Sequence, residues 1–314
     1  MPEADQQAPG PAATPSRPPG PADGLLVVDK DPGWTSHDVV ARCRRIVGQR
    51  RVGHAGTLDP AATGILLVAL GRVTRLTRFL GALSKSYTGE VVLGSATTTL
   101  DDQGDVVERY DMRGVTVGQA REAARHLTGE IMQTPPMVSA RKVAGRRLYQ
   151  LAREGIEVER TARPVTVSRF DVEPTDEPGV FAIEVDCSSG TYVRALAADL
   201  GSALGGGAHL RRLRRQAIGS FTLSEAGRLD ELSPDSAVAS VLSPAEAMRD
   251  YPRLRVDDAV AEAVGHGVRM ERADVGPVGE GPWAVVDEGG RLLAVYEQGD
   301  DARLKPAVVL VTSQ

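Results

Sequence analysis

The stretch RVGHAGTLDPAATGILLVAL, residues 51–70, places one acidic residue in a glycine-rich segment and then continues into an unbroken apolar run. Asp59 precedes Pro60, and an Asp-Pro pair favours the start of a turn. Residues 65–70 form a short, wholly apolar run, which predicts a buried strand. A carboxylate beside such a strand loses hydration at a cost. Two interpretations therefore remain open: Asp59 caps a turn, or a loop presents it as a nucleophile or base at the rim of a sheet.

The segments around this stretch alternate between strand and helix patterns. Strands are expected at residues 24–29, 65–70, 87–93, 165–172, 181–186 and 209–221, and helices at about 36–47, 72–80, 117–127, 147–154 and 191–204. Residues 101–105, DDQGD, lack the spacing of an EF-hand calcium loop and predict a hairpin turn. Because the order has no regular strand–helix–strand rhythm, it predicts an α+β fold, with a mixed, largely antiparallel central sheet flanked by helices.

Composition divides the chain of 314 residues into four parts. Residues 1–23 are rich in proline, alanine and glycine and carry too few large apolar groups to offset chain entropy, so a disordered tail is expected. Residues 24–223 are expected to form the main domain, and residues 224–250 a helical connector. From 251 to 314 short apolar segments alternate with glycine turns, which predicts a small β-barrel-like domain.

The net charge of −5 is unevenly distributed. Residues 24–223 hold 27 Lys and Arg against 22 Asp and Glu, whereas residues 224–314 hold 9 against 17. The main domain is therefore basic and the C-terminal part acidic, and this asymmetry says more about partners than the total does.

Several classes of protein are excluded by the sequence. No apolar run approaches the roughly 18 residues that span a bilayer, and the N-terminus lacks the pattern of a secretory signal. Cys43 and Cys187 lie far apart without a CxxC motif, which argues against a disulfide framework and a zinc site. The sequence shows neither a phosphate-binding P-loop nor a dinucleotide fingerprint. A reducing, cytoplasmic location is expected.

Besides the segment around Asp59, three groups of residues could carry chemistry. Residues 85–87, KSY, set an aromatic group beside a cation at the start of an expected strand. Residues 186–194, DCSSGTYVR, lie where a strand turns into a helix. Residues 209–215, HLRRLRR, mix leucine with four arginines. Each group has a simple structural alternative, because tyrosines are often half-buried in strands and charge runs are usually solvated.

Together these segments resemble the TruB family of bacterial tRNA pseudouridine-55 synthases, from about residue 24 to residue 221, with a weaker match beyond. The matching segments are residues 53–64 with the family's catalytic motif, 29–36 with its first motif, 135–142 with the start of an RNA-gripping insertion, and 189–194 with the motif that faces the catalytic loop. One departure is visible: the first motif usually has proline directly after lysine, whereas here Asp31 intervenes before Pro32.

The resemblance implies the pseudouridine synthase fold and the isomerisation of uridine-55 in the T-loop of tRNA to pseudouridine by base flipping. The C1′–N1 bond breaks, the uracil turns and a C1′–C5 bond forms, so no cofactor and no metal is required. Asp59 matches the catalytic aspartate, and attack on uracil C6 and chemistry at C1′ both remain open. A flipped base needs a substitute for its lost stack.

The resemblance also assigns roles around the flipped base. Arg194 is expected to pair with Asp59 and keep it ionised. The residues implied to bind the substrate are His54 beside the displaced loop, Tyr87 stacked on the uracil, Tyr192 lining the pocket and assisting proton transfer at C5, Arg194, and Leu213 as an apolar wall.

Affinity for RNA is expected to come mainly from phosphate contacts. The insertion at about 134–163 holds seven Lys and Arg against three Glu, and it is expected to close over the RNA. The C-terminal domain resembles a PUA domain, but its acidity predicts only an auxiliary role. The candidate contacts to the RNA backbone are Lys30, Arg141, Lys142, Arg146, Arg147 and Arg211.

The expected partner is the T-arm stem-loop of tRNA, bound by a monomer without an obligate protein partner or a membrane. Two alternatives remain open. One is a guide-RNA-dependent pseudouridine synthase of the dyskerin type, which relies on protein partners. The other is a tRNA-binding folding factor whose main role is not catalytic. The intact insertion favours recognition of tRNA by the chain alone.

Overall fold

The computed structural model describes residues 23–137, 142–143, 146–147, 156, 158–299, 301 and 303–311. For 142–143 and 146–147 only the backbone is described. The expected tail except Asp23, most of the insertion at 134–163, and nearly all of the helix expected at 147–154 lie outside the described residues.

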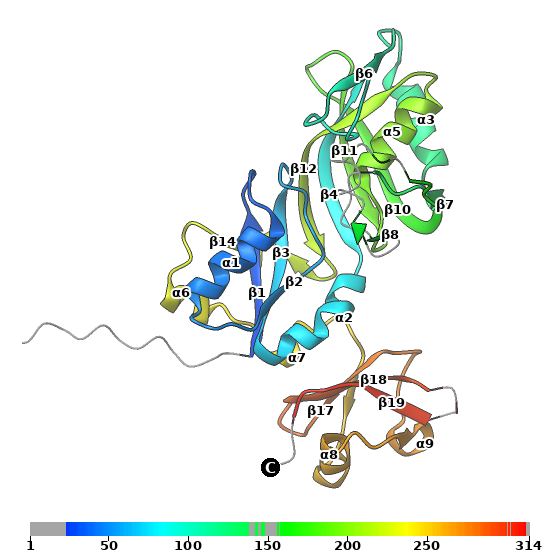
Figure 1. Ribbon diagram of the computed structural model, residues 1–314. Coiled ribbons are helices and arrows are strands. Elements are labelled where there is room, and N and C mark those ends of the chain that lie inside the picture. Colours follow the sequence, from blue (N-terminus) through cyan, green and yellow to red (C-terminus); the bar gives the residue numbers. More distant parts are fainter. Residues whose placement is uncertain are drawn as a thin grey trace, which may run out of the picture.

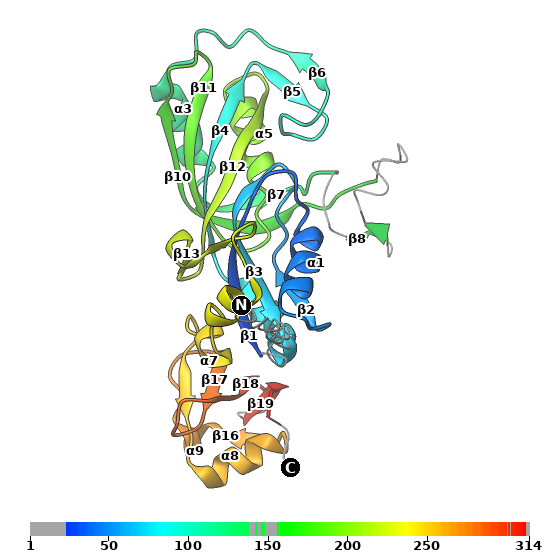
Figure 2. The ribbon, with the colours of Figure 1, turned by 90° about the vertical axis from the view of Figure 1, so that its left-hand side faces the viewer.

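Figure 1 shows two unequal bodies. We call residues 23–250 the main body and residues 251–311, which lie below it in orange and red, the C-terminal module. Figure 2, turned by 90°, shows helices α3, α5 and α1 packed against the long strands of the main body. No helix in the described part of the chain is both long and apolar enough to cross a bilayer.

The main body is built on a ten-stranded sheet. In spatial order its path is β14 (Gly227–Arg228), β1 (Gly24–Lys30), β3 (Thr63–Leu70), β12 (Ala208–Ile218), β4 (Lys85–Leu93), β11 (Val180–Cys187), β10 (Arg163–Pro174) and β7 (Gly129–Gln133), with β2 (Val52–Ala55) paired to β3 and β13 (Phe221–Thr222) paired to β12. Among the described pairs of this sheet, β1–β14 and β3–β12 are parallel and the others antiparallel. The predicted fold class is confirmed.

Strand β3 is buried on both faces, as its unbroken apolar run predicts. Ile65 and Leu67 point into the core that β3 shares with the C-terminal module, whereas Leu66 and Val68 point into the core beneath α1 (Ser36–Ile46). Successive side chains of a strand alternate between faces, so an all-apolar strand must be covered on both sides.

Helix α1 begins where the sequence places its capping signals. The Thr35 hydroxyl accepts a hydrogen bond from the Asp38 N–H, and the Asp38 carboxylate accepts one from the Thr35 N–H. This capping box satisfies two amide groups that the first helical turn leaves free. Val39, Val40 and Cys43 then face the sheet.

Helices α3 (Val117–His126) and α5 (Val193–Ala203) cover the other half of the sheet. Their buried residues join those of β4, β10, β11 and β12 in a second core. Between β4 and α3, β5 (Ser95–Thr97) and β6 (Val106–Arg109) form a hairpin, which confirms the turn predicted at residues 101–105.

The C-terminal module contains a five-stranded sheet in the order β15-β17-β18-β19-β16, with α8 (Asp258–Gly265) and α9 (Arg272–Val275) beside it. Its strands are β15 (Arg253–Arg255), β16 (Met270–Glu271), β17 (Trp283–Val286), β18 (Leu292–Gln298) and β19 (Arg303–Val309). Module residues such as Val295 and Leu310 belong to the core that lines one face of β1 and β3. The connector holds α6 (Pro234–Ala239) and α7 (Pro244–Ala247), but it also supplies β14, which the sequence did not predict.

The two halves of the main sheet meet where β3 runs parallel to β12. The pairing covers Thr63 with Arg214 and Gly64 with Arg215. Gly64 has φ +99°, and a Cβ there would lie 2.2 Å from the Arg215 carbonyl oxygen. Glycine is therefore required both for the backbone conformation and for the approach of the two strands.

Replacing Gly64 tests this junction. Gly129 has φ +100°, but a Cβ added there would meet no atom within 4 Å, so Gly129→Ala carries the conformational cost without the clash. We expect Gly64→Ala to lower the free energy of unfolding by at least about 2 kcal/mol more than Gly129→Ala, measured by urea unfolding. Equal losses in the two variants would contradict a steric requirement at the junction.

Candidate active site

A cavity of about 270 Å³ opens at the junction of β3 and β12. Its wall comes from five parts of the chain: the loop after β2, helix α2 (Thr77–Ala82), the start of β4, the turn before α5 with the first residues of that helix, and β12. The lining residues are Gly56, Thr57, Leu58, Asp59, Gly81, Lys85, Tyr87, Gly190, Thr191, Tyr192, Val193, Arg194, Leu213 and Arg215. The volume is at the small end of ligand sites and suits a group of the size of one base.

The loop that carries Asp59 is shorter than its glycine content suggests. Residues 52–55 form strand β2, paired antiparallel with β3, so the loop begins only at Gly56. Ala62 N–H donates to the Asp59 carbonyl at 3.1 Å, which closes a turn. Leu58 N–H donates to the Ser36 hydroxyl at 2.9 Å, which ties the loop to α1. Asp59 is thus a turn residue whose side chain also lines the cavity.

An ion pair connects Asp59 to Arg194. The Arg194 Nε lies 2.9 Å from Asp59 Oδ2, and the side chains are 5% and 41% exposed. Arg194 also donates from Nη1 to the Thr99 carbonyl at 2.8 Å, and the same nitrogen lies 3.6 Å from Asp101 Oδ2. A guanidinium fixed by three partners holds the Asp59 carboxylate in one position.

The charge state of Asp59 results from opposing effects. Burial raises the pKa of Asp59 above its ordinary value, the Arg194 guanidinium lowers it, and Asp101 raises it. Lys30 also lowers this pKa. Since two-fifths of the side chain is exposed, solvent moderates the effect of burial. Arg194 is therefore the main group that favours the ionised carboxylate.

Asp101 is a site residue that the sequence did not single out. It lies in the turn of the β5–β6 hairpin, where its Oδ1 accepts from the Gln103 N–H at 3.1 Å. The preceding Leu100 has φ +62°, a conformation that costs free energy in a residue other than glycine. Leu100 also accepts from the Leu210 N–H at 3.0 Å, which anchors the turn on β12. In the sequence, DDQGD looks like any polar turn.

Arg215 is a second residue that sequence reasoning missed, since it was one arginine in a run. Its guanidinium is buried and donates to the carbonyls of Ile65 at 2.7 Å, Gly56 at 3.2 Å and Thr57 at 3.4 Å. It therefore connects β3 to both residues at the start of the loop at 56–62, which we call the catalytic loop because catalysis is its predicted role. Arg215 pairs with Tyr87 in the β12–β4 register. Its positive charge therefore also lies close to the β4 side of the cavity.

Lys30, which was expected to contact the RNA backbone, is buried inside the protein. Its side chain is completely buried, and Nζ donates to the carbonyls of Asp31 at 3.0 Å, Trp34 at 2.9 Å and Pro60 at 3.1 Å. An ammonium group that is fully buried and faces carbonyls is not presented to a phosphate in this structure, and the predicted contact to the RNA backbone stays a prediction. Lys30 instead joins the β1–α1 loop to the catalytic loop. Burial lowers the pKa of Lys30 to about 8.

Tyr87 and Lys85 line the cavity from β4. Burial raises the pKa of Tyr87, so its phenol is neutral in the folded protein at neutral pH. Lys85 is buried next to it along the strand and donates to the carbonyls of Gly81 and Leu83. Tyr87 thus offers an apolar ring to the cavity.

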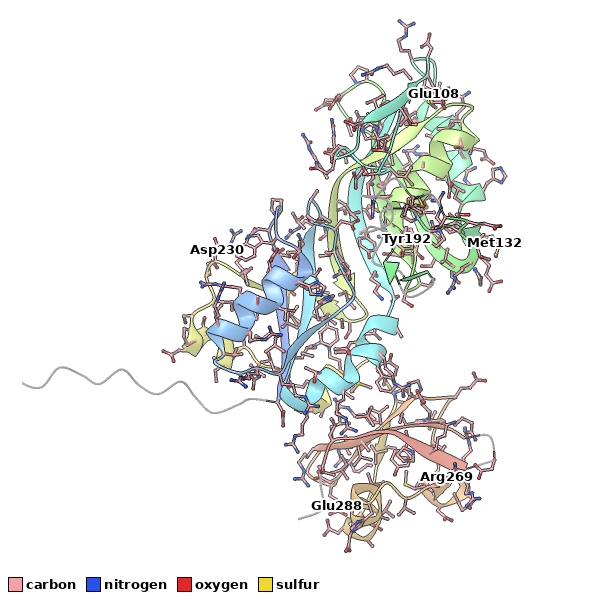
Figure 3. The ribbon with its side chains drawn as sticks, in the orientation of Figure 1. Glu108, Met132, Tyr192, Asp230, Arg269 and Glu288 are labelled. Atoms are coloured by element: carbon pink, nitrogen blue, oxygen red, sulfur yellow. The ribbon has the colours of Figure 1, made fainter. Side chains whose placement is uncertain are left out.

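Tyr192 is positioned through its main chain. Its N–H donates to Gln133 Oε1 at 2.7 Å, and Gln133 Nε2 donates to the Tyr192 carbonyl at 3.1 Å. Gln133 is buried at the end of β7, so the edge of the sheet fixes the turn before α5. Figure 3 shows Tyr192 well inside the outline of the main body, whereas Asp230 and Met132 lie at its periphery. Leu213 reaches the same cavity from β12.

The structure therefore brings five of the six predicted base-site residues to one cavity: Asp59, Tyr87, Tyr192, Arg194 and Leu213. His54 does not line it. His54 lies on β2 opposite Val68, and its ring packs edge-to-face on that of His37 at 5.4 Å. Its predicted place beside a displaced RNA loop stays a prediction.

The remaining candidates for phosphate contacts divide into two sets. Arg211 is engaged with carboxylates, since its Nε lies 2.6 Å from Glu90 and its Nη2 lies 2.7 Å from Glu177. A phosphate would have to compete with both. Arg141 and the side chains of Lys142, Arg146 and Arg147 lie outside the described residues. Within the described part of the chain, no three His, Cys, Asp or Glu side chains gather as ligands for a metal ion.

Three family models match consecutive parts of the chain. Residues 44–193 match the TruB family pseudouridylate synthase N-terminal domain, residues 194–249 the tRNA pseudouridylate synthase B C-terminal domain, and residues 251–311 the tRNA pseudouridine synthase II C-terminal domain. The boundary between the first two models falls between Val193 and Arg194, inside helix α5. Strand β12 therefore belongs to the second model, although it lies in the same sheet as the strands of the first.

Curated relatives match over nearly the whole chain. The tRNA pseudouridine synthase B of Rhodococcus jostii (strain RHA1) is 48% identical over 88% of this chain and 90% of its own length. The protein of the same name from Thermobifida fusca (strain YX) is 44% identical over 93% of this chain and its full length. Among solved structures, a Cbf5-Nop10-Gar1 complex contains a chain that is 25% identical, with a TM-score of 0.70, covering 92% of this chain and 85% of that one.

Lys85 provides a test of burial at this site. Burial and the nearby Arg215 lower the pKa of Lys85 from 10.5 to about 8. Between these values the unfolded chain holds the proton and the folded protein does not, so stability rises with pH. We expect the unfolding free energy of the wild type, relative to Lys85→Met, to rise by up to about 1 kcal/mol per unit from about pH 8 to about 9.5 in urea unfolding. A difference independent of pH would contradict the lowered pKa.

Proposed function

This chain belongs to the TruB family of pseudouridylate synthases, and we propose that it isomerises uridine-55 in the T-loop of tRNA to pseudouridine. The observation that carries the proposal is the Asp59 carboxylate, paired with the buried Arg194 at 2.9 Å in a cavity of the size of one base. An ionised carboxylate fixed beside an apolar ring suits covalent chemistry on a uracil nucleoside.

The reaction needs no external reactant. The C1′–N1 bond breaks, the uracil turns within the cavity, and C1′ bonds to C5. The proton on C5 is lost and N1 ends protonated, so substrate and product are isomers. Asp59 would add either to uracil C6 or to C1′ and would leave in the last step, which splits one difficult rearrangement into easier ones. Tyr192, which lines the same cavity, is placed to assist the proton transfer from C5.

Access to this cavity requires that the uridine leaves its stack. A cavity of about 270 Å³ admits a base but not a base pair, so the substrate must be extruded from the RNA. Tyr87 and Leu213 would replace the lost stacking from the adjacent strands β4 and β12. In this proposal the chain acts on tRNA as a monomer, without a protein partner.

The decisive experiment incubates the purified protein with an unmodified tRNA transcript and maps pseudouridine. We expect product at position 55 without any other protein or guide RNA. Asp59→Asn should lower the rate at least about 100-fold, the usual contribution of one positioned catalytic group or more. Product formed only with added partner proteins would favour the guide-dependent alternative.

A matched control for this experiment is Asp111→Asn, since Asp111 is exposed and pairs with Arg113 away from the cavity. It should keep the wild-type rate. An Asp59→Asn protein that modifies tRNA as fast as the wild type would exclude Asp59 as the catalytic group. Refolding of misfolded tRNA by Asp59→Asn at the wild-type rate would show that a folding activity is separable from catalysis.

The pH profile tests the role of Arg194. Arg194 lowers the pKa of Asp59, so Arg194→Gln should raise this pKa further. If the ionised carboxylate is the reactive form, the acid limb of kcat/KM moves to higher pH by roughly one to three units. Arg194→Lys keeps the positive charge but loses the forked geometry of the guanidinium. The acid limb of kcat/KM in this variant should therefore stay nearer that of the wild type, while the rate of pseudouridine formation falls. An acid limb that does not move in Arg194→Gln would exclude this role.

A further inference from the structure

Trp34 is a large aromatic side chain that the site described above does not use. It lies in the loop between β1 and α1 and is 36% exposed. The chain has two tryptophans, and the other, Trp283, is 0% exposed in the core of the C-terminal module. An exposed tryptophan next to the catalytic loop is costly unless it meets a partner, because its apolar ring remains in contact with water.

Two hollows adjoin Trp34. One, of about 420 Å³, is lined by Pro32, Gly33, Trp34, Asp38, Ala41 and Arg45. The other, of about 280 Å³, is lined by Asp31, Trp34, Arg42, Arg45, Leu229 and Asp230. Trp34 and Arg45 are the residues that both hollows share. The Trp34 indole and the Arg45 guanidinium therefore lie between the two hollows.

The first hollow leads towards the active site. The lining of a further cavity of about 360 Å³ includes Asp59 and Arg194 as well as Pro32 and Gly33. Pro32 and Gly33 also line the larger hollow at Trp34. The hollow at Trp34 and the cavity that reaches Asp59 therefore adjoin at Pro32 and Gly33.

The loop that holds Trp34 is fixed to the catalytic loop. Gly33 N–H donates to the Pro60 carbonyl at 2.8 Å. Lys30 Nζ bridges the carbonyls of Trp34 at 2.9 Å and Pro60 at 3.1 Å. The backbone of Trp34 is therefore held in a set position relative to the Asp59 loop, which favours a residue that recognises a ligand.

The charges around Trp34 favour a polyanion. Arg44 is used within the fold, since it donates to the Arg50 and Val52 carbonyls. Arg42 and Arg45, on the same helix, make no ion pair with any described residue. Of the nearby carboxylates, Asp38 serves the capping box of α1. The other two, Asp31 and Asp230, lie 3.9 and 3.3 Å from Arg228.

We propose that Trp34 stacks on a base of the substrate RNA that neighbours the reacting uridine, while Arg42 and Arg45 contact its phosphates. The proposal rests on the proposed function, because it takes RNA as the substrate. Stacking of a base on an aromatic ring tolerates any sequence, and it would hold the strand in place once the uridine has left its stack. Trp34 is thus a positioning residue: it touches RNA outside the catalytic cavity.

Intrinsic fluorescence reads this contact directly, because Trp283 is buried and Trp34 is not. The full chain carrying Asp59→Asn is titrated with the T-arm stem-loop, so that no turnover interferes. We expect saturable quenching of the emission. The same protein with Trp34→Phe, whose emission comes from Trp283, should show no change on binding. RNA that binds, as measured by filter retention, without quenching Trp34 overturns the proposal.

Affinity and turnover separate positioning from catalysis. Trp34→Ala should weaken RNA binding by about 5- to 100-fold and raise KM, with kcat at saturating tRNA within about twofold of the wild type. Trp34→Phe should recover part of the affinity, because it keeps an aromatic face. An unchanged affinity in Trp34→Ala, or equal losses in the two variants, overturns stacking.

The salt dependence of binding tests the arginines. Arg42→Gln and Arg45→Gln should each reduce the slope of log affinity against log salt by about one. Arg113→Gln is the control, since Arg113 is exposed on the distant β6–α3 loop and should leave the slope unchanged. Unchanged slopes in Arg42→Gln and Arg45→Gln overturn the phosphate contacts. A failure of the proposed function would appear separately, as wild-type protein that binds RNA but forms no pseudouridine.

Discussion

The buried guanidinium of Arg215 is the interaction on which the active site depends. It donates to the carbonyl of Ile65 in β3 and to the carbonyls of Gly56 and Thr57 at the start of the catalytic loop. Its own backbone meets Gly64, where a Cβ would lie 2.2 Å away. A buried charge is tolerated only when its hydrogen bonds are made, so these carbonyls cannot move without leaving it unsatisfied. The two halves of the sheet and the catalytic loop are therefore fixed together.

The same charge contributes to an unusual electrostatic environment. Buried cations at Lys30, Lys85, Arg194 and Arg215 surround one partly exposed carboxylate, that of Asp59. Burial raises the pKa of this carboxylate, and Arg194 and Lys30 oppose the rise. The cost appears in the lysines, since burial lowers the pKa of both to about 8. The fold thus gives up stability to place buried cations beside the Asp59 carboxylate.

Much of the fold could be predicted from the sequence because its signals are local. The apolar run of β3 and the capping box before α1 each lie within a few neighbouring residues. The errors share one cause, which is dependence on distant partners. Strand β14 has only two residues and is defined by its pairing with β1. Strand β2 was predicted as part of a loop because the segment is rich in glycine, and only its pairing with β3 makes it a strand. Gln133 and Asp101 were missed likewise, since their partners Tyr192 and Arg194 lie at least 59 residues away in sequence.

The acidity of the C-terminal module follows from its place in the fold. Its residues Ala284, Val295 and Leu310 complete the core on one face of β1 and β3, together with residues of α2 and α7 such as Phe79 and Ala247. The contact is reinforced by polar bonds, such as that from Arg72 Nη1 to the Leu310 carbonyl at 2.9 Å. A sheet that is apolar on both faces is unstable when one of these faces is exposed to water. Covering that face accounts for the module without any contact to RNA, so a surplus of carboxylates there is compatible with a basic main body that binds a polyanion.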